Sequence, residues 1–137
     1  MANEPKYQTV GQITATNTMR FRENTNGMTM AISLLASRTP GAPVVDDTGK
    51  FVGFLSEFDI LRALEKGKDL NAIQAKDLME IDRITVAPST PIKDAVLLLE
   101  KNRLLNLPVV ENGIVTMTVS RHDLLRAWLG LDVGMEF

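Results

Sequence analysis

Apolar residues recur along the chain with helical spacing in two places. Both stripes follow the order i, i+3, i+4 and i+7, which is typical of an amphipathic helix with one buried face. The first stripe is Met28, Ala31, Ile32 and Leu35, and the second is Ile92, Ala95, Val96 and Leu99. We therefore expect helices over residues 28–37 and from Pro91 to about Asn102, each burying its stripe.

Short runs of β-branched and aromatic residues follow each of these helices and predict a hairpin. The first hairpin has strands over 43–45 and 51–55 around a turn at 46–49, and the second has strands over 108–110 and 114–119 around Asn112-Gly113. Extended segments are expected before the helices, at 19–22 and 84–86. Second helices are expected over 56–65 and 123–129, so that each half has the order β-α-β-β-α.

The two halves also share individual residues, which indicates a duplicated structural unit. Pro43-Val44-Val45 returns 65 positions later as Pro108-Val109-Val110, and the tetrad Ser-x-x-Asp at 56–59 returns 64 positions later at 120–123. We predict a first repeat over residues 8–66, a polar connector over 67–74 and a second repeat over 75–129. The C-terminal tail, residues 130–137, is expected to be loosely ordered.

Composition excludes several classes of function. The chain has 137 residues and a net charge of −2, and its 15 Lys and Arg are scattered, so we expect no nucleic-acid surface. It has no Cys, which removes disulfides, thiolate nucleophiles and Cys-based zinc sites. Neither a signal-peptide pattern nor a run of about 18 apolar residues is present, so we expect a cytoplasmic protein without membrane spans.

The two Ser-x-x-Asp tetrads have two interpretations. A Ser followed three residues later by an acid before an apolar run is a helix capping box. Each tetrad also stands where a strand ends and a helix begins, so backbone N–H groups and the helix dipole favour an anion such as phosphate there. The carboxylates of Asp59 and Asp123 could then accept hydrogen bonds from a vicinal diol. The sequence leaves both interpretations open.

The order β-α-β-β-α with Pro-Val-Val, a turn and then the Ser-x-x-Asp tetrad resembles the cystathionine-β-synthase (CBS) domain, which occurs as tandem pairs called Bateman modules. The resemblance covers residues 8 to 129. It implies an α+β fold of two CBS repeats packed with pseudo-two-fold symmetry. It also implies two clefts between the repeats that bind AMP, ADP, ATP or S-adenosylmethionine.

The resemblance assigns residues to each cleft, because the tetrad of one repeat faces the adenine pocket of the other. The first cleft would comprise Ser120, Arg121, Asp123, Met19, Arg20, Ala31, Gly41 and Ala42. The second would comprise Ser56, Asp59, Ile84, Thr85, Asn106 and Leu107. We favour the first cleft for a nucleotide, since Arg121 can bind phosphate whereas Glu57 in the other tetrad would repel it. Both side chains could instead simply face solvent.

Function in trans is the main expectation, because no catalytic or transport domain accompanies the repeats. Ser120, His122 and Asp123 lie within four positions at a helix start, so they diverge and cannot form a catalytic triad. We therefore expect neither an enzyme nor a metal site. The rival interpretation is a homodimeric interaction module with empty clefts, since Leu97, Leu98 and Trp128 extend beyond the core stripes of their helices. A homodimer is expected in both cases, and the regulated partner is unknown.

Overall fold

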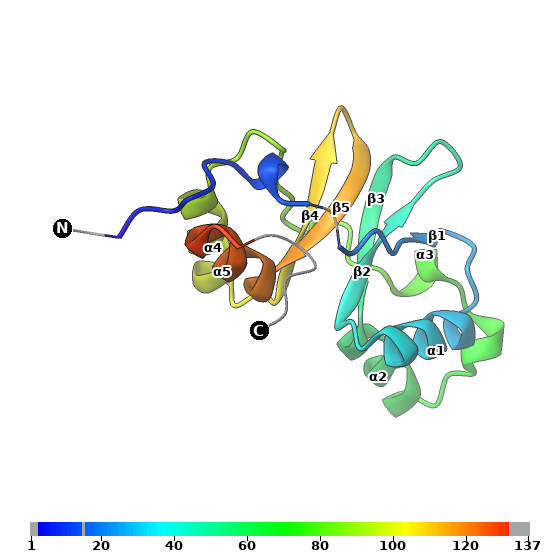
Figure 1. Ribbon diagram of the computed structural model, residues 1–137. Coiled ribbons are helices and arrows are strands. Elements are labelled where there is room, and N and C mark those ends of the chain that lie inside the picture. Colours follow the sequence, from blue (N-terminus) through cyan, green and yellow to red (C-terminus); the bar gives the residue numbers. More distant parts are fainter. Residues whose placement is uncertain (1–2, 15, 132–137) are drawn as a thin grey trace. The chain divides into compact units, whose positions relative to one another are not determined.

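The computed structural model describes residues 3–14 and 16–131, which form a mixed α+β fold of two compact units (Figure 1). Unit 1 comprises Met1–Thr18, Ile84–Asn112 and Thr116–Phe137, and unit 2 comprises Met19–Arg83 and Gly113–Val115. Most of the predicted tail, residues 132–137, lies outside the described residues. The fold class expected from the sequence is therefore confirmed.

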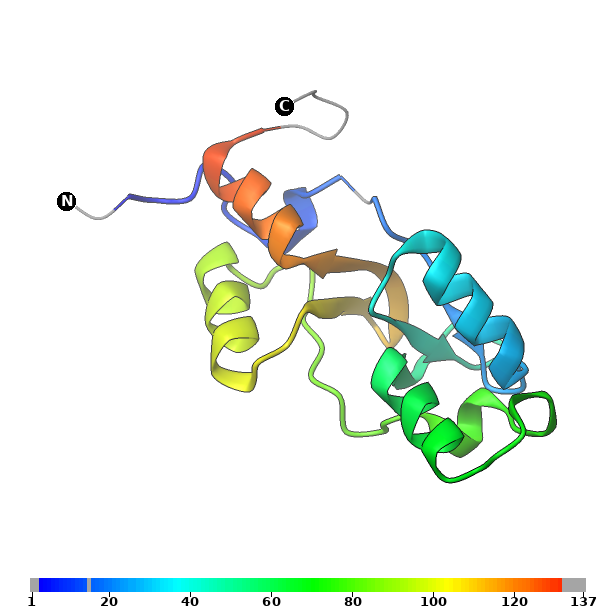
Figure 2. The same cartoon turned by 90° about the horizontal axis from the view of Figure 1, so that it is seen from below.

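Unit 2 is built on a three-stranded sheet. Its elements are β1 (Phe21–Arg22), α1 (Gly27–Ser37), β2 (Gly41–Val45), β3 (Phe51–Ser56), α2 (Glu57–Glu65), a 3-10 turn (Leu70–Ala72) and α3 (Ala75–Leu78). The strand order is β1-β2-β3, with β1 parallel and β3 antiparallel to β2. Helices α1 and α2 pack against each other (Figure 2). The hairpin and both helices were predicted to within two residues at each end.

Unit 1 contains most of the second repeat. Its elements are a 3-10 turn (Val10–Gln12), α4 (Ile92–Asn102), β4 (Asn106–Glu111), β5 (Ile114–Ser120), which begins in unit 2, and α5 (Arg121–Leu129). The hairpin turns at Asn112 and Gly113, whose positive φ angles of 52° and 82° match the predicted tight turn. The predicted strand over 84–86 is wrong, because only Val86 pairs, in one parallel bridge to Val109.

The segment that leads into each repeat packs on the other repeat. Backbone bonds join the N-terminal segment to the start of α4, from Val10 N to Thr90 O at 2.9 Å and from Ile92 N to Gln8 O at 3.1 Å. In unit 2, Phe54 and Glu80 exchange two backbone bonds of 2.9 and 2.8 Å. Neither repeat therefore completes its core from its own consecutive residues.

The predicted buried stripe is correct for α4 and wrong for α1. Ile92, Ala95 and Leu99 are buried, with Val96 partly buried. In α1 the buried residues are instead Gly27, Met30 and Leu34, which align with those of α4 at the constant offset of 65. Met28, Ile32 and Leu35 are exposed, the last two to 58% and 70%.

Helix α1 could not reveal its buried face by periodicity because it carries no charged side chain to mark the solvent side. Contact with the 3-10 turn decides the face. A Cβ atom on Gly27 would lie 2.8 Å from the carbonyl oxygen of Leu70, so only glycine permits this close approach. The stripe predicted to be buried consequently forms the outer surface of the helix.

Candidate functional site: the two tetrads

Each tetrad forms a complete capping box. The Asp59 N–H donates to Ser56 Oγ at 3.2 Å, and Asp59 Oδ2 accepts from Ser56 N at 2.8 Å and from Ser56 Oγ at 3.0 Å. Asp123 and Ser120 repeat this geometry with distances of 3.2, 2.8 and 3.1 Å. The capping interpretation of the sequence is thus confirmed for both tetrads.

Capping occupies only one oxygen of each carboxylate. Asp59 Oδ1 accepts from Arg62 Nη1 at 3.1 Å, and Asp123 Oδ1 accepts from Thr16 Oγ1 at 3.2 Å. Arg62 is largely exposed, so its ion pair contributes little to stability. In both tetrads Oδ1 is bound to a group that a ligand hydroxyl could replace without disturbing the cap. A carboxylate fixed by its cap is therefore compatible with the diol interpretation.

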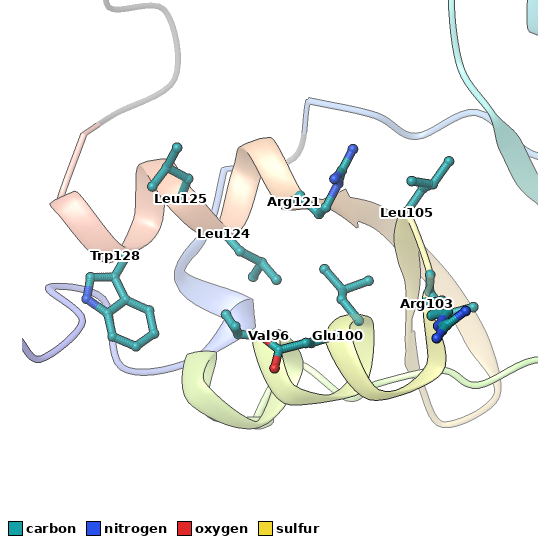
Figure 3. A pocket seen from close by; sticks show the side chains of 10 residues that line it. Val96, Glu100, Arg103, Leu105, Arg121, Leu124, Leu125 and Trp128 are labelled. Atoms are coloured by element: carbon teal, nitrogen blue, oxygen red, sulfur yellow. The ribbon is translucent and has the colours of Figure 1, made fainter.

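Asp123 and Arg121 line different hollows of unit 1. Asp123 is buried and borders a small hollow together with Tyr7, Thr14 and Arg126. Arg121 borders a larger groove between α4 and α5 (Figure 3). The two residues stand at the first and third positions of α5, which point about 200° apart around a helix. The expected joint action of Arg121 and Asp123 on one nucleotide stays a prediction.

The groove between α4 and α5 has a volume of about 590 Å³, which is within the range of small-molecule sites. Its lining consists of Val96, Leu99, Glu100, Arg103, Leu104, Leu105, Arg121, Leu124, Leu125 and Trp128. Trp128 stands at one end, and Arg103 with Leu105 stands at the other (Figure 3). The sequence indicated only Trp128 as a spare apolar position in this region.

A half-buried cation, Arg83, lies near the Asp59 tetrad. The guanidinium carbon of Arg83 stands 4.0 Å from the centre of the Phe54 ring, two residues before Ser56. Burial lowers the pKa of Arg83, while the carboxylates of Glu80 and Asp59 oppose that shift. The Asp59 tetrad therefore has the positive charge of Arg83 nearby, in addition to the negative charge of the exposed Glu57. Sequence reasoning considered only Glu57.

The residues of unit 2 that were predicted for the first cleft lie around the sheet and α1. Arg20 donates from Nη1 to the carbonyl oxygen of Val115 at 2.7 Å, which fixes its side chain. Met19 and Ala31 are partly buried against the core of unit 2. A Cβ atom on Gly41 would lie 2.5 Å from Cε1 of the Phe54 ring, so glycine at this position leaves room for the ring. Ala42 is buried, so only its backbone could reach a ligand.

The residues of unit 1 that were predicted for the second cleft are similarly placed in or beside the core. Leu107 is fully buried and Asn106 nearly so. Ile84 packs partly against the core, and Thr85 borders a shallow hollow with Leu97 and Leu98. Each predicted cleft draws residues from both units, and this pairing stays a prediction.

Sequence reasoning missed a basic residue three positions after each tetrad. Arg62 and Arg126 follow Asp59 and Asp123 at the same spacing, so the repeated motif is Ser-x-x-Asp-x-x-Arg. Arg62 binds its Asp, and Arg126 borders the hollow of Asp123. The duplication itself could have revealed both. Thr16 had no such signal, because 107 positions separate it from Asp123.

Over residues 3–14 and 16–131, no helix has both the length and the apolar character needed to cross a membrane. Over the same residues, no group of three or more His, Cys, Asp or Glu side chains could hold a metal ion.

The fold and the paired tetrads define a tandem-repeat protein with two equivalent strand-to-helix sites. The sequence profile of the CBS domain matches residues 10–66 and again residues 75–130. The chain belongs to the CBS domain family and contains a tandem CBS pair.

Similar proteins include other CBS pairs and parts of larger proteins. MJ1225 of Methanocaldococcus jannaschii is 28% identical over 95% of this chain, which spans 44% of that protein. The fold is similar to the crystal structure of CBSX2 in complex with AMP, with a TM-score of 0.77 and 28% sequence identity. The match covers 90% of this chain and 97% of that one. The CBS pair of MJ0100, in complex with 5′-methylthioadenosine and S-adenosyl-L-methionine, is 25% identical with a TM-score of 0.76, covering 89% and 96%.

Proposed function

We propose that this chain is a regulatory module that binds an adenosine-containing ligand (AMP, ADP or ATP) at its tetrads and acts in trans on a partner protein. The proposal rests on the geometry of the two aspartates. In each tetrad the helix cap fixes the carboxylate and engages only Oδ2. The complexes of CBSX2 with AMP and of MJ0100 with adenosine derivatives support this class of ligand.

The proposed chemistry divides the ligand between two groups of the tetrad. The Oδ1 atoms of Asp59 and Asp123 accept hydrogen bonds from the ribose hydroxyls, replacing Arg62 and Thr16. The start of the following helix, with the Ser hydroxyl, favours the phosphate. Binding of this kind needs neither a nucleophile nor a metal, so the proposed function is sensing and not catalysis.

The Asp123 site is proposed as the stronger of the two sites. Its carboxylate is more buried than that of Asp59, so a hydrogen bond to ligand is less weakened by competing water. Its Oδ1 atom also exchanges one hydroxyl partner for another, whereas Asp59 must release a charged guanidinium.

The experiment is calorimetric titration of the protein with AMP, ADP, ATP and S-adenosylmethionine, with GMP as the control for the base. We expect saturable binding of at least one adenine nucleotide and none of GMP. If S-adenosylmethionine binds and the nucleotides do not, S-adenosylmethionine is the ligand of the module. No binding by any of the four would overturn the proposal.

A second candidate is a homodimeric interaction module whose sites stay empty. The exposed apolar side chains of α1 favour it, because a helix without charges is rarely left facing water. A homodimer is proposed under both functions. The two are separated by ligand-induced stabilisation, which only the sensing module predicts.

A further inference from the structure

The groove between α4 and α5, which we call the α4–α5 groove, is an apolar hollow that lies entirely within unit 1. Two of its lining residues, Leu99 and Leu124, are buried. Two others, Leu105 and Leu125, are exposed to 49% and 61%. Covering these exposed leucines with an apolar group is favourable, because it removes their surface from water. The groove therefore favours an apolar occupant.

The size and shape of the groove suit a small elongated molecule. Its volume of about 590 Å³ is within the range of small-molecule sites. Trp128 stands at one end, and Arg103 stands at the other (Figure 3). Along α5 the lining extends from Arg121 to Trp128, which corresponds to a length on the order of 10 Å. An unbranched alkyl chain of medium length matches these dimensions.

The charged residues of the groove are distributed unevenly along it. Arg103 and Arg121 lie toward the end opposite Trp128, and Glu100 lies between the two ends (Figure 3). In the part of the chain that the structure describes, none of these three side chains takes part in an ion pair. Two guanidinium groups and one carboxylate leave a single excess positive charge in the groove. A monoanion complements that charge better than a dianion does.

We propose that the α4–α5 groove binds an amphiphilic monoanion, an unbranched alkyl carboxylate of medium chain length. Its carboxylate lies beside Arg103, and its chain extends along the leucines toward Trp128. Arg121 adds to the positive potential at the carboxylate end, and Glu100 opposes it. The groove is distinct from the hollow that Asp123 borders, so this inference goes beyond the proposed function and does not depend on it.

Trp128 makes the groove directly observable, because it is the only tryptophan of the chain and lines the groove. The probe is decanoate, titrated below the concentration at which it forms micelles while tryptophan emission is recorded. We expect a saturable blue shift, with affinity about fourfold lower for each methylene removed from the chain. Decanol, which has no charge, should bind at least about tenfold more weakly. Equal affinities for decanoate and decanol would overturn the inference.

Charge variants test where the carboxylate lies. Arg103→Gln should lower the affinity for decanoate at least about tenfold and affect decanol much less, whereas Glu100→Gln should raise the affinity for decanoate. Arg38→Gln is the matched control, because Arg38 ends α1 as Arg103 ends α4, with φ angles of 55° and 53°, but lies in unit 2.

The arginine residues at both positions are exposed, so circular dichroism should show unchanged folding of these two variants. An affinity for decanoate that Arg103→Gln leaves unchanged, or that Arg38→Gln lowers equally, would contradict the proposed site.

Other occupants of the groove give different results. If decyltrimethylammonium binds more tightly than decanoate, Glu100 determines the preference and the inference is wrong. If tryptophan emission changes with protein concentration and not with decanoate, a second copy covers the groove and the inference is also wrong. AMP titration of the same samples keeps the two proposals separate. Binding of AMP without decanoate overturns this inference alone, whereas binding of decanoate without any adenosine ligand overturns the sensing function alone.

Discussion

At the scale of single residues, capping and ligand binding use different atoms of the same aspartates. The cap engages Oδ2 of Asp59 and Asp123, and Oδ1 interacts with Arg62 in one tetrad and Thr16 in the other. A motif common at helix starts can therefore serve a ligand without losing its structural role. Substitutions should separate the two contributions.

Asp123→Ala should weaken adenine-nucleotide binding more than it weakens the fold. Loss of a charged hydrogen-bond acceptor costs about 1.5–3 kcal/mol of binding free energy, whereas loss of a helix-start acid costs about 1 kcal/mol of unfolding free energy. Asn26→Ala is the matched control, because Asn26 caps α1 through Met28 N and Thr29 N outside the proposed site. If both variants lower stability and neither alters binding, the tetrad is a cap alone.

Arg121→Ala should lower the affinity for AMP and ATP and leave the affinity for adenosine unchanged, if this arginine reaches the phosphate as the sequence suggests. The loss should shrink as salt rises, because exposed charges are screened. Arg103→Ala removes the other arginine of the groove and should leave all three affinities unchanged. Unchanged AMP affinity in Arg121→Ala would assign Arg121 to the groove only.

At the scale of elements, local hydrogen bonds end helices and close turns. The turn between β2 and β3 is organised by Asp46, whose Oδ1 accepts from Thr48 Oγ1 at 2.6 Å, Thr48 N at 2.8 Å and Lys50 N at 3.0 Å. The hydrogen bond from the Thr48 side chain, followed by those from the two backbone N–H groups, lowers the pKa of Asp46. The charged carboxylate therefore stabilises the hairpin.

The stabilisation by Asp46 should depend on pH with a defined sign. Because the native pKa lies below the unfolded value of about 3.9, the contribution is present above that pH and is lost as pH falls through the native pKa. Asp46→Asn should lower the urea midpoint at pH 7, and its difference from wild type should narrow toward acid. Asp47→Asn, at the neighbouring exposed position, is the control. A difference that is constant with pH would contradict this account.

At the scale of the whole molecule, each leading segment completes the core of the other repeat, so the two repeats depend on each other for folding. A ligand that prefers the folded chain must raise its melting temperature. At 100 times its dissociation constant, AMP should add about 2.7 kcal/mol to the unfolding free energy. Differential scanning fluorimetry with AMP, and with GMP as control, measures this, and an equal shift from both would point to non-specific binding.

The sequence by itself determined the features that depend on residues close together in the chain. Capping bonds join residues three apart and the Asn112-Gly113 turn spans a few positions, so residue identity was enough to place both tetrads and both hairpins. The duplication revealed the family for the same reason, since it is a pattern of identities. Helix α4 showed its buried face because charged residues mark the opposite one.

The tertiary structure alone decided the features that depend on contacts between distant residues. Contact of Gly27 with Leu70 chose the buried face of α1, and Thr16 reached Asp123 across 107 positions. The stacking of Arg83 on Phe54 also arises from packing. The periodicity of a single helix does not show which other element it will pack against. That contact depends on the shapes of the surfaces that meet in the folded chain.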